Sequence, residues 1–287
     1  MTNARLLRVA VVGVLGATAT PAADAVFHLM QIEQVIGGVN GDTTVQAIQL
    51  RMRSTFQQFV TGARVRVWDA QGQNPILLTD FGMDVLFDQP VGRRVLIGSA
   101  SFSGVLDGPL TPDFIMVNLI PASYLAAGSI TFEDDPFMGN DGIIWWRLSW
   151  GGAGYTGSTL GAGGVGANDA DGDFGVWPGP LPSSGVQALQ FQGPATAMST
   201  NNADDYALTA GPATFTNNAA QTATLVSSPP CPWDCQAVPS GSVDVPDLLA
   251  LLAVWNIPGA SPCDFDNTNL VNVPDLLKLL ANWGPCP

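Results

Sequence analysis

The stretch Gln46-Ala-Ile-Gln-Leu-Arg-Met-Arg53 alternates apolar and polar side chains at successive positions. Neighbouring side chains of an extended strand point to opposite faces, so its isoleucine, leucine and methionine share one face and its arginines the other. Residues Ala63–Asp69 repeat the pattern, with two valines opposite two arginines and a tryptophan. Both segments therefore predict half-buried β-strands.

Similar runs continue along the chain, at residues 94–99, 114–120, 129–133, 143–150 and 187–191. Turn-forming sequences such as Asn40-Gly41 and Asn140-Asp-Gly142 separate them. No helical periodicity of convincing length interrupts residues 26–226, which predicts a sandwich or a barrel. The opening of this region and its first alternating segments resemble a lamin-tail-type, immunoglobulin-like β-sandwich. The expected fold class is therefore mainly β, with a sandwich favoured over a barrel.

A different pattern follows the short Pro-containing linker at residues 227–230. The segment Val243–Trp255 recurs 28 residues later as Val271–Trp283, with three differences. Both copies place apolar residues at helical spacing, on the faces Leu248, Leu251, Leu252 and Trp255, and Leu276, Leu279, Leu280 and Trp283. Each helix is too short to be stable alone, so we expect the two apolar faces to bury each other.

Oxygen-bearing residues recur at alternate positions just before the second helix. The candidate ligands are Asp264, Asp266, Thr268, the carbonyl of Leu270, Asn272 and Asp275. Ca²⁺ takes six or more oxygens, and alternate residues of a tight loop supply them. Asn269 stands where such a loop turns sharply, and asparagine tolerates a left-handed backbone. The pattern predicts a calcium loop; a polar turn with a helix N-cap is the alternative.

Two such loop–helix units in tandem, over Cys231–Pro287, resemble the type I dockerin. This resemblance implies an α-helical module with calcium as cofactor and a cohesin-like or other cell-surface protein as partner. In that family the residues just before each closing Asp help to recognise the partner. The resemblance therefore implies a hydrophobic contact through Val245, Pro246, Val273 and Pro274.

The first unit departs from the calcium-loop pattern, because Gln236 and Val238 stand where oxygen ligands are expected. The remaining candidates are Ser240, the carbonyl of Ser242, Asp244 and Asp247. Asp234 is a further donor if the loop is enlarged around Pro239. We therefore expect the second loop to dominate calcium binding.

The start of the chain has the features of a signal peptide. Arg5 and Arg8 precede an apolar run at residues 9–17, and Ala23-Asp24-Ala25 fits the cleavage rule. The run is too short to span a bilayer, and no later segment is long and apolar enough to do so. We therefore expect a secreted, periplasmic or cell-surface protein without a transmembrane segment after cleavage.

Exported proteins commonly form disulfides, so the position of the cysteines is informative. All four follow residue 230. They favour two disulfides over a metal site, because Cys231 and Cys235 lack Cys-x-x-Cys spacing. Cys235 and Cys263 occupy equivalent positions of the repeat. We therefore predict the pairs Cys235–Cys263 and Cys231–Cys286.

Composition excludes several classes of partner. The chain has 10 Lys and Arg against 24 Asp and Glu, a formal net charge of −14. It cannot present the broad basic surface that nucleic acid requires, and anionic membranes would repel it.

Catalytic residues are scarce before residue 227, where the chain has two glutamates, one histidine and no cysteine. The densest acidic cluster, Glu133–Asp135, is interpreted as a solvated turn, with a glycosidase acid pair as the alternative. Asp169, Asp171 and Asp173 fit either a weak calcium loop or an Asp/Gly turn.

Two features of this region suggest glycan binding. Trp145 falls on the outward phase of its strand and could stack on a sugar ring unless a loop covers it. Five arginines share that phase and could hold an acidic glycan, or form ordinary cross-strand pairs with Asp. They are Arg51, Arg53, Arg64, Arg66 and Arg147.

The sequence thus predicts a signal peptide (1–25), a β-sandwich domain (26–226), a linker (227–230) and a dockerin-like domain (231–287). The expected function is that of an exported, non-catalytic surface or assembly protein, attached through its C-terminal repeats. The alternative is a carbohydrate-binding or polysaccharide-degrading subunit of an extracellular complex.

Overall fold

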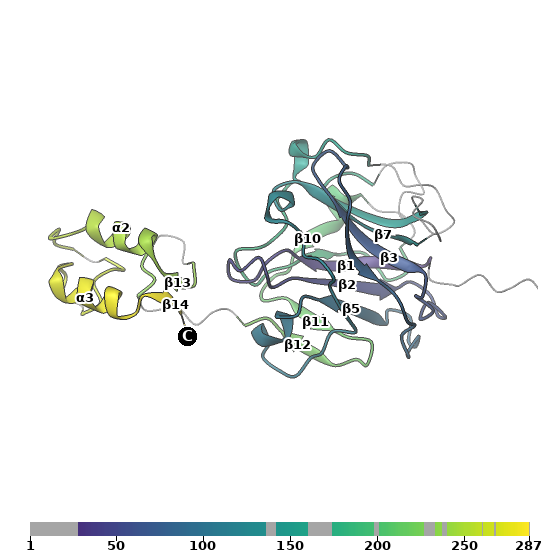
Figure 1. Ribbon diagram of the computed structural model, residues 1–287, viewed down its shortest axis with the longest axis horizontal. Helices are drawn as coiled ribbons and strands as arrows, with labels where there is room; N and C mark the ends of the chain where they lie inside the picture. Colours follow the sequence, from purple (N-terminus) through teal and green to yellow (C-terminus); the bar gives the residue numbers. More distant parts are fainter. Residues whose placement is uncertain are drawn as a thin grey trace, which may run out of the picture.

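The computed structural model describes residues 28–135, 142–159, 174–197, 201–226, 233–236, 240–259, 261–266 and 268–286. The chain is mainly β, as the alternating segments predict, and the β-unit is sandwich-like (Figure 1). The predicted signal peptide, the linker at 227–230 and Asp169, Asp171 and Asp173 lie outside the described residues. None of the helices within the described ranges is long and apolar enough to cross a bilayer.

A six-stranded sheet forms one layer of the β-unit, in the order β10-β9-β1-β2-β5-β6. Its strands are β1 (Met30–Ile36), β2 (Ala47–Met52), β5 (Arg94–Gly98), β6 (Phe114–Ile115), β9 (Leu189–Phe191) and β10 (Tyr206–Leu208). Neighbours are antiparallel except β5 and β6, which are parallel. The opening alternating segment therefore forms β2, at the centre of this sheet.

A four-stranded antiparallel sheet forms the second layer, in the order β4-β3-β7-β8. Its strands are β3 (Ala63–Trp68), β4 (Ile76–Asp80), β7 (Gly128–Asp134) and β8 (Ile144–Trp150). Apolar side chains from both sheets form one core, which includes Ile32, Leu50, Val65, Phe132 and Trp146. Full burial of each such side chain contributes about 1.5–3 kcal/mol, so this core is the main source of stability of the β-unit.

A two-stranded hairpin, β11 (Thr214–Thr216) and β12 (Thr222–Thr224), accompanies the six-stranded sheet. It contributes Phe215 and Ala223 to a second apolar cluster, together with Leu96 of β5 and Phe102. Four single-turn helices complete the β-unit: η1 (Phe102–Val105), η2 (Ala122–Tyr124), η3 (Gly152–Gly154) and α1 (Asn202–Asp205).

The arginines predicted to face outward are largely buried, and Arg51, Arg64 and Arg66 form ion pairs with the two glutamates. Glu133 on β7, fully buried, pairs with Arg64 and Arg66 of the neighbouring β3. Asp135 also pairs with Arg64, at 2.6 Å. The interpretation of Glu133–Asp135 as a solvated turn is therefore wrong for Glu133, and cross-strand pairing accounts for both arginines.

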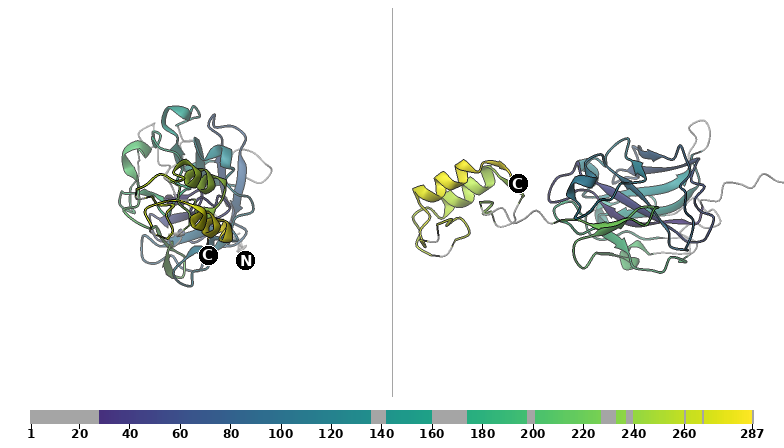
Figure 2. Two further views of the ribbon diagram at one scale, coloured as in Figure 1. Left: turned by 90° about the vertical axis from the view of Figure 1, so that its left-hand side faces the viewer. Right: turned by 90° about the horizontal axis from the view of Figure 1, so that it is seen from below.

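The C-terminal unit contains two short antiparallel helices, α2 (Val245–Ala253) and α3 (Val273–Ala281), lying side by side (Figures 1 and 2). Short strands β13 (Ser242–Val243) and β14 (Gly284–Pro285) pair beside them. The core is small, and its buried members are Cys235, Val243, Leu251, Cys263, Val271 and Leu279.

Three of the eight residues of the predicted helix contact faces are buried less than expected. Leu251 and Leu279 are buried, and Leu248 and Leu276 pack partly against them. Leu252, Leu280 and Trp283, however, are about half-exposed. A nine-residue helix offers its small neighbour only one narrow stripe, so the flanking leucines stay at the surface.

Candidate metal centre

The loop between the helices turns as the sequence predicts. Asn269 adopts the left-handed conformation, with φ 59°. Both carboxylate oxygens of Asp264 accept backbone N–H groups across this turn, from Thr268 at 3.1 Å and from Asn269 at 2.7 Å. Asp264 therefore shapes the loop and brings the acidic side chains that follow back toward it.

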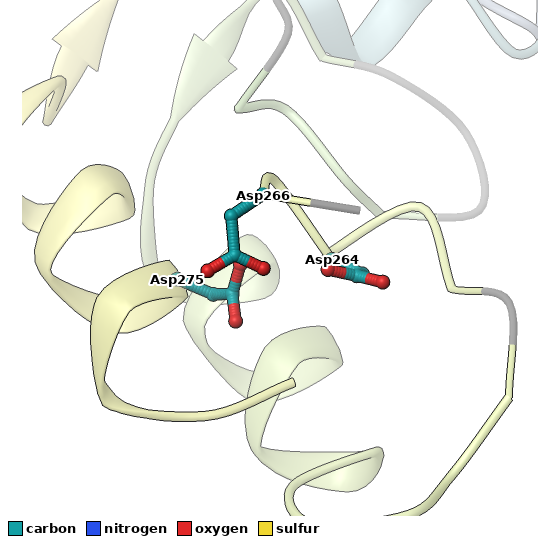
Figure 3. Close-up of side chains that lie close together, drawn as sticks. All are labelled: Asp264, Asp266 and Asp275. Atoms are coloured by element: carbon teal, nitrogen blue, oxygen red, sulfur yellow. The ribbon is translucent and has the colours of Figure 1, made fainter. Parts of the chain in front are cut away.

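Three predicted ligands converge in this loop. Asp264, Asp266 and Asp275 each present a carboxylate oxygen, and these oxygens lie within 4.8 Å of one another (Figure 3). The first two side chains come from the loop and the third from the first turn of α3. Three negative charges at this spacing repel one another, so a divalent cation placed among them is favoured. Elsewhere in the described chain, no other group of three acidic, histidine or cysteine ligands meets this spacing.

The other predicted ligands lie in the same loop but are engaged with one another. Thr268 Oγ donates to Asp266 at 2.7 Å and lies 3.3 Å from the Leu270 carbonyl oxygen. Asn272 Nδ2 donates to that carbonyl at 3.0 Å. These oxygens fit the hard-donor set that Ca²⁺ prefers, and together with the three carboxylates they meet its required number.

Asp275 also has a structural role at the start of α3. Asn272 and Asp275 form a capping box, in which Asp275 accepts the Asn272 N–H at 3.0 Å. Its other oxygen accepts the Phe265 N–H at 2.8 Å. The N-cap alternative is thus present, and it coexists with the acidic cluster rather than replacing it.

Hydrogen bonding tunes the charge of the loop. The hydrogen bond from Thr268 lowers the pKa of Asp266 below its ordinary value, which keeps this carboxylate ionised. Lys278, on α3, donates to the Phe265 carbonyl at 2.9 Å and brings one positive charge close to the loop. Sequence analysis did not single out Lys278; its place as one of three differences between the repeats is the signal that marks it.

The first unit repeats this architecture with a different donor set. Asp247 is fully buried and accepts the N–H groups of Cys235 at 2.8 Å, Gln236 at 3.1 Å and Asp244 at 2.9 Å. Gln236, which stands where Asp264 stands in the second unit, thus contributes its backbone to Asp247. Val238 lies outside the described residues.

Asp234 is the further donor that the sequence suggested for an enlarged first loop. Its Oδ2 accepts the Gly241 N–H at 2.8 Å, whereas its Oδ1 is buried without a hydrogen-bond partner. Burial raises the pKa of Asp234, and the neighbouring Asp247 carboxylate raises it further. Burial and Asp247 also raise the pKa of Asp244, whose Oδ1 is likewise unpartnered. Ser240 and Ser242 hydrogen-bond each other, Ser240 Oγ donating to the Ser242 carbonyl at 2.9 Å.

A predicted disulfide joins the two loop–helix repeats within the C-terminal unit. Cys235 and Cys263 are bonded, as their equivalent positions in the repeat predict. Cys286 is also disulfide-bonded, and its predicted partner Cys231 lies outside the described residues.

The predicted partner-binding residues lie on a repeated exposed surface. Val245 and Val273 are each 56% exposed, and Pro246 and Pro274 beside them are also exposed. Leu249 and Leu277 continue the surface one turn later, at 61% and 60%, and Leu252 and Leu280 follow, at 49% and 48%. We call these two rows the leucine stripes of α2 and α3. Leu252 and Leu280 were predicted to pack between the helices, and Leu249 and Leu277 were not predicted as contacts, although their recurrence at the 28-residue offset identifies them.

Trp145, the residue of the predicted weak glycan site, lies at the edge of the β-unit core. Trp145 is half-buried against the core of the β-unit, and its ring lies 5.4 Å from the ring of His28.

Comparison of the chain with protein-family models, with curated proteins and with solved structures finds no match. The function proposed below therefore depends on the geometry of the chain itself and on the resemblance of its repeats.

Proposed function

We propose that this protein is an exported, non-catalytic assembly component whose C-terminal unit docks onto a cohesin-like or other cell-surface protein. The single observation that carries this proposal is the pair of leucine stripes. Both stripes read Val, Pro, Leu, Leu along their helices, and corresponding leucines differ by only one percentage point in exposure.

A repeated apolar surface of this kind needs a reason. Scattered exposed apolar residues are ordinary on a soluble protein, whereas contiguous rows mark interaction sites. Apolar anchors at i, i+4 and i+7 of a helix are the pattern by which helices bind a groove. The C-terminal unit has a small core, and the eight apolar side chains of the stripes do not add to it. Their exposure therefore does not serve the stability of the unit.

Calcium is proposed as the cofactor that holds this surface in place. Asp264 and Asp266 lie in the loop before α3 and Asp275 lies in its first turn, so a cation among them would fix the helix that carries one stripe. The donor set is all oxygen, which selects Ca²⁺ over softer metals.

The test compares matched leucine-to-aspartate variants of the mature protein in calcium. We expect the double variant Leu249→Asp/Leu277→Asp to bind immobilised cohesin modules, or an extracellular surface fraction, at least tenfold more weakly than the unmodified protein. The control is Leu86→Asp, because Leu86 is 86% exposed but lies in the β-unit. Equal loss in the control, or full retention in the double variant, would refute docking through the stripes.

A second candidate function, carbohydrate binding, is favoured by a cavity in the β-unit. The cavity has a volume of about 340 Å³ and is lined by Leu125, Trp177, Pro180, Pro182 and Leu208, among others. Trp177 is half-buried there, so part of its ring is available for stacking on a sugar.

Retention on insoluble polysaccharides separates this candidate from docking alone. If the cavity binds sugar, Trp177→Ala should abolish retention, and Trp145→Ala should leave it unchanged because Trp145 does not line the cavity. Retention that is absent from the unmodified protein, or unaffected by Trp177→Ala, counts against carbohydrate binding there.

A further inference from the structure

A second cavity of the β-unit is lined by arginines, although the chain as a whole is acidic. It has a volume of about 320 Å³ and opens where β2 ends and β5 begins. Its lining includes Arg51, Arg93, Arg94, Ala195, Thr216 and Asn217. Three of the ten basic residues of the chain therefore gather around one hollow.

Glu33 neutralises part of this charge and is fully used in doing so. Its Oε1 lies 2.9 Å from Arg94 Nη2 and 3.0 Å from Arg51 Nη1. Its Oε2 accepts from Arg94 Nε at 2.7 Å and from Gln49 Nε2 at 2.8 Å. The carboxylate holds two arginines in fixed positions beside the cavity and has no oxygen left for a third.

Arg93 is that third arginine. Its guanidinium lies 4.9 Å from the ring centre of Phe87, and its Nε is buried without a hydrogen-bond partner. Asp113 is near enough for an electrostatic interaction, but its Oδ2 already accepts the N–H groups of Leu96 and Asn218, each at 2.8 Å. A charged group with a buried, unpartnered donor is costly, and Arg93 lines the cavity, so an oxyanion there would bring a counter-charge to its guanidinium.

We propose that this cavity binds a small oxyanion, the carboxylate or sulfate group of an acidic sugar or similar ligand. Three guanidiniums against Glu33 and Asp113 leave one net positive charge, which one oxyanion balances. Arginine is suited to the task because its planar fork binds planar oxyanions with two parallel hydrogen bonds. The volume lies at the small end of ligand sites, which admits a single sugar residue. The proposal does not depend on docking by the C-terminal unit.

The test is calorimetric titration of the mature protein at low salt with glucuronate, inorganic sulfate and glucose. We expect glucuronate or sulfate to bind and glucose not to bind. Arg93→Gln should weaken the oxyanion at least tenfold, and Arg93→Lys should weaken it less. Lys278→Gln, which removes the same charge from the C-terminal unit, should have no effect. Raising the salt concentration should weaken binding, because screening reduces the attraction.

A second variant protects the test against misfolding of Arg93→Gln. Ala195→Phe fills the cavity from a half-buried loop position and leaves all three arginines in place. It should also abolish binding. Stronger binding of glucuronate than of sulfate assigns a carboxylated sugar, and the reverse order assigns a sulfated ligand. Glucose binding as tightly as glucuronate, no oxyanion binding, or full binding by both cavity variants would overturn the proposal.

Discussion

The only two glutamates of the chain have the same role in different sheets. Glu33 lies on β1 and holds Arg51 and Arg94, and Glu133 lies on β7 and holds Arg64 and Arg66. Each is a nearly or fully buried carboxylate that two arginines of neighbouring segments share. Burial removes the screening that makes surface ion pairs weak, so loss of either carboxylate removes a counter-charge from two largely desolvated arginines.

Glu133→Gln should therefore destabilise the β-unit by about 3–5 kcal/mol, the usual cost of leaving a buried charge unpaired. Chemical denaturation measures the change. Asp135→Asn is the matched control, because Asp135 also pairs with Arg64 but is about one-third exposed. We expect a much smaller effect in the control; equal effects would show that burial of Glu133 is not what matters.

Tyr206 is a second residue whose contribution to the stability of the β-unit can be tested. Its hydroxyl is buried, donates to the Ile32 carbonyl at 2.5 Å and accepts from Trp146 Nε1 at 2.8 Å, so it links β10, β1 and β8. Burial raises the pKa of Tyr206, which therefore stays protonated. Tyr206→Phe should cost about 1–3 kcal/mol, because two buried polar groups lose their partner. Tyr124→Phe, at an exposed hydrogen bond to Asn74, should cost less in the same denaturation assay.

At the scale of elements, strands were predictable where alternation runs undisturbed. β2, β3, β7 and β8 each have five or more residues in regular register; β2, β3 and β8 fall within predicted runs, and β7 extends one residue beyond its run at each end. β1 is harder to find, because a register shift between Ile32 and Gln34 breaks its alternation. Strands β9 to β12 have three residues each, too few for a period of two to be distinctive, although β9 lay within a predicted run.

The two loop–helix units should differ in calcium binding. We expect one clear site by titration, abolished by Asp264→Ala and largely retained in Asp244→Ala, because among the described residues only those of the second loop bring three carboxylates within 4.8 Å. At a hundredfold excess over its dissociation constant, calcium adds about 2.7 kcal/mol. In a unit of this size that raises the melting temperature by roughly 10 °C or more.

Equal loss of binding in both variants would contradict this expectation. It would mean that Asp234, whose Oδ1 is buried and unpartnered, completes a site of equal strength in the first loop. A melting temperature that does not respond to calcium would remove the metal from the proposal.

For the whole molecule, the two units should unfold separately. The cores of the β-unit contain no cysteine, whereas the core of the C-terminal unit includes the Cys235–Cys263 pair. We expect two calorimetric transitions, of which a reductant or a calcium chelator lowers only the smaller. Closing a loop of 28 residues is worth about 3–4 kcal/mol, so reduction alone should shift that transition clearly. A single transition that shifts as one would show that the units are coupled.

Whether a site could be predicted from the sequence also depended on how far apart its residues lie along the chain. The candidate metal centre could be predicted because its donors lie within a segment of twelve residues, at the alternate spacing that is typical of calcium loops. The arginine-lined cavity could not, since its walls come from segments around residues 51, 92, 195 and 217. Alternation placed Arg51 on the outward face of its strand, but only the fold shows what meets it there.

The position of β1 has a consequence for how the protein is made. β1 lies between β2 and β9, and Gln34 contacts Gln190, 156 residues further along the chain. At a synthesis rate of 5–20 residues per second, roughly 8–30 s separate the emergence of these two partners. Throughout that interval one edge of β1 has no strand to pair with, and an open edge invites pairing with other chains. The nascent polypeptide therefore depends on delayed folding, or on a chaperone that shields this edge, until about two-thirds of the chain has been synthesised.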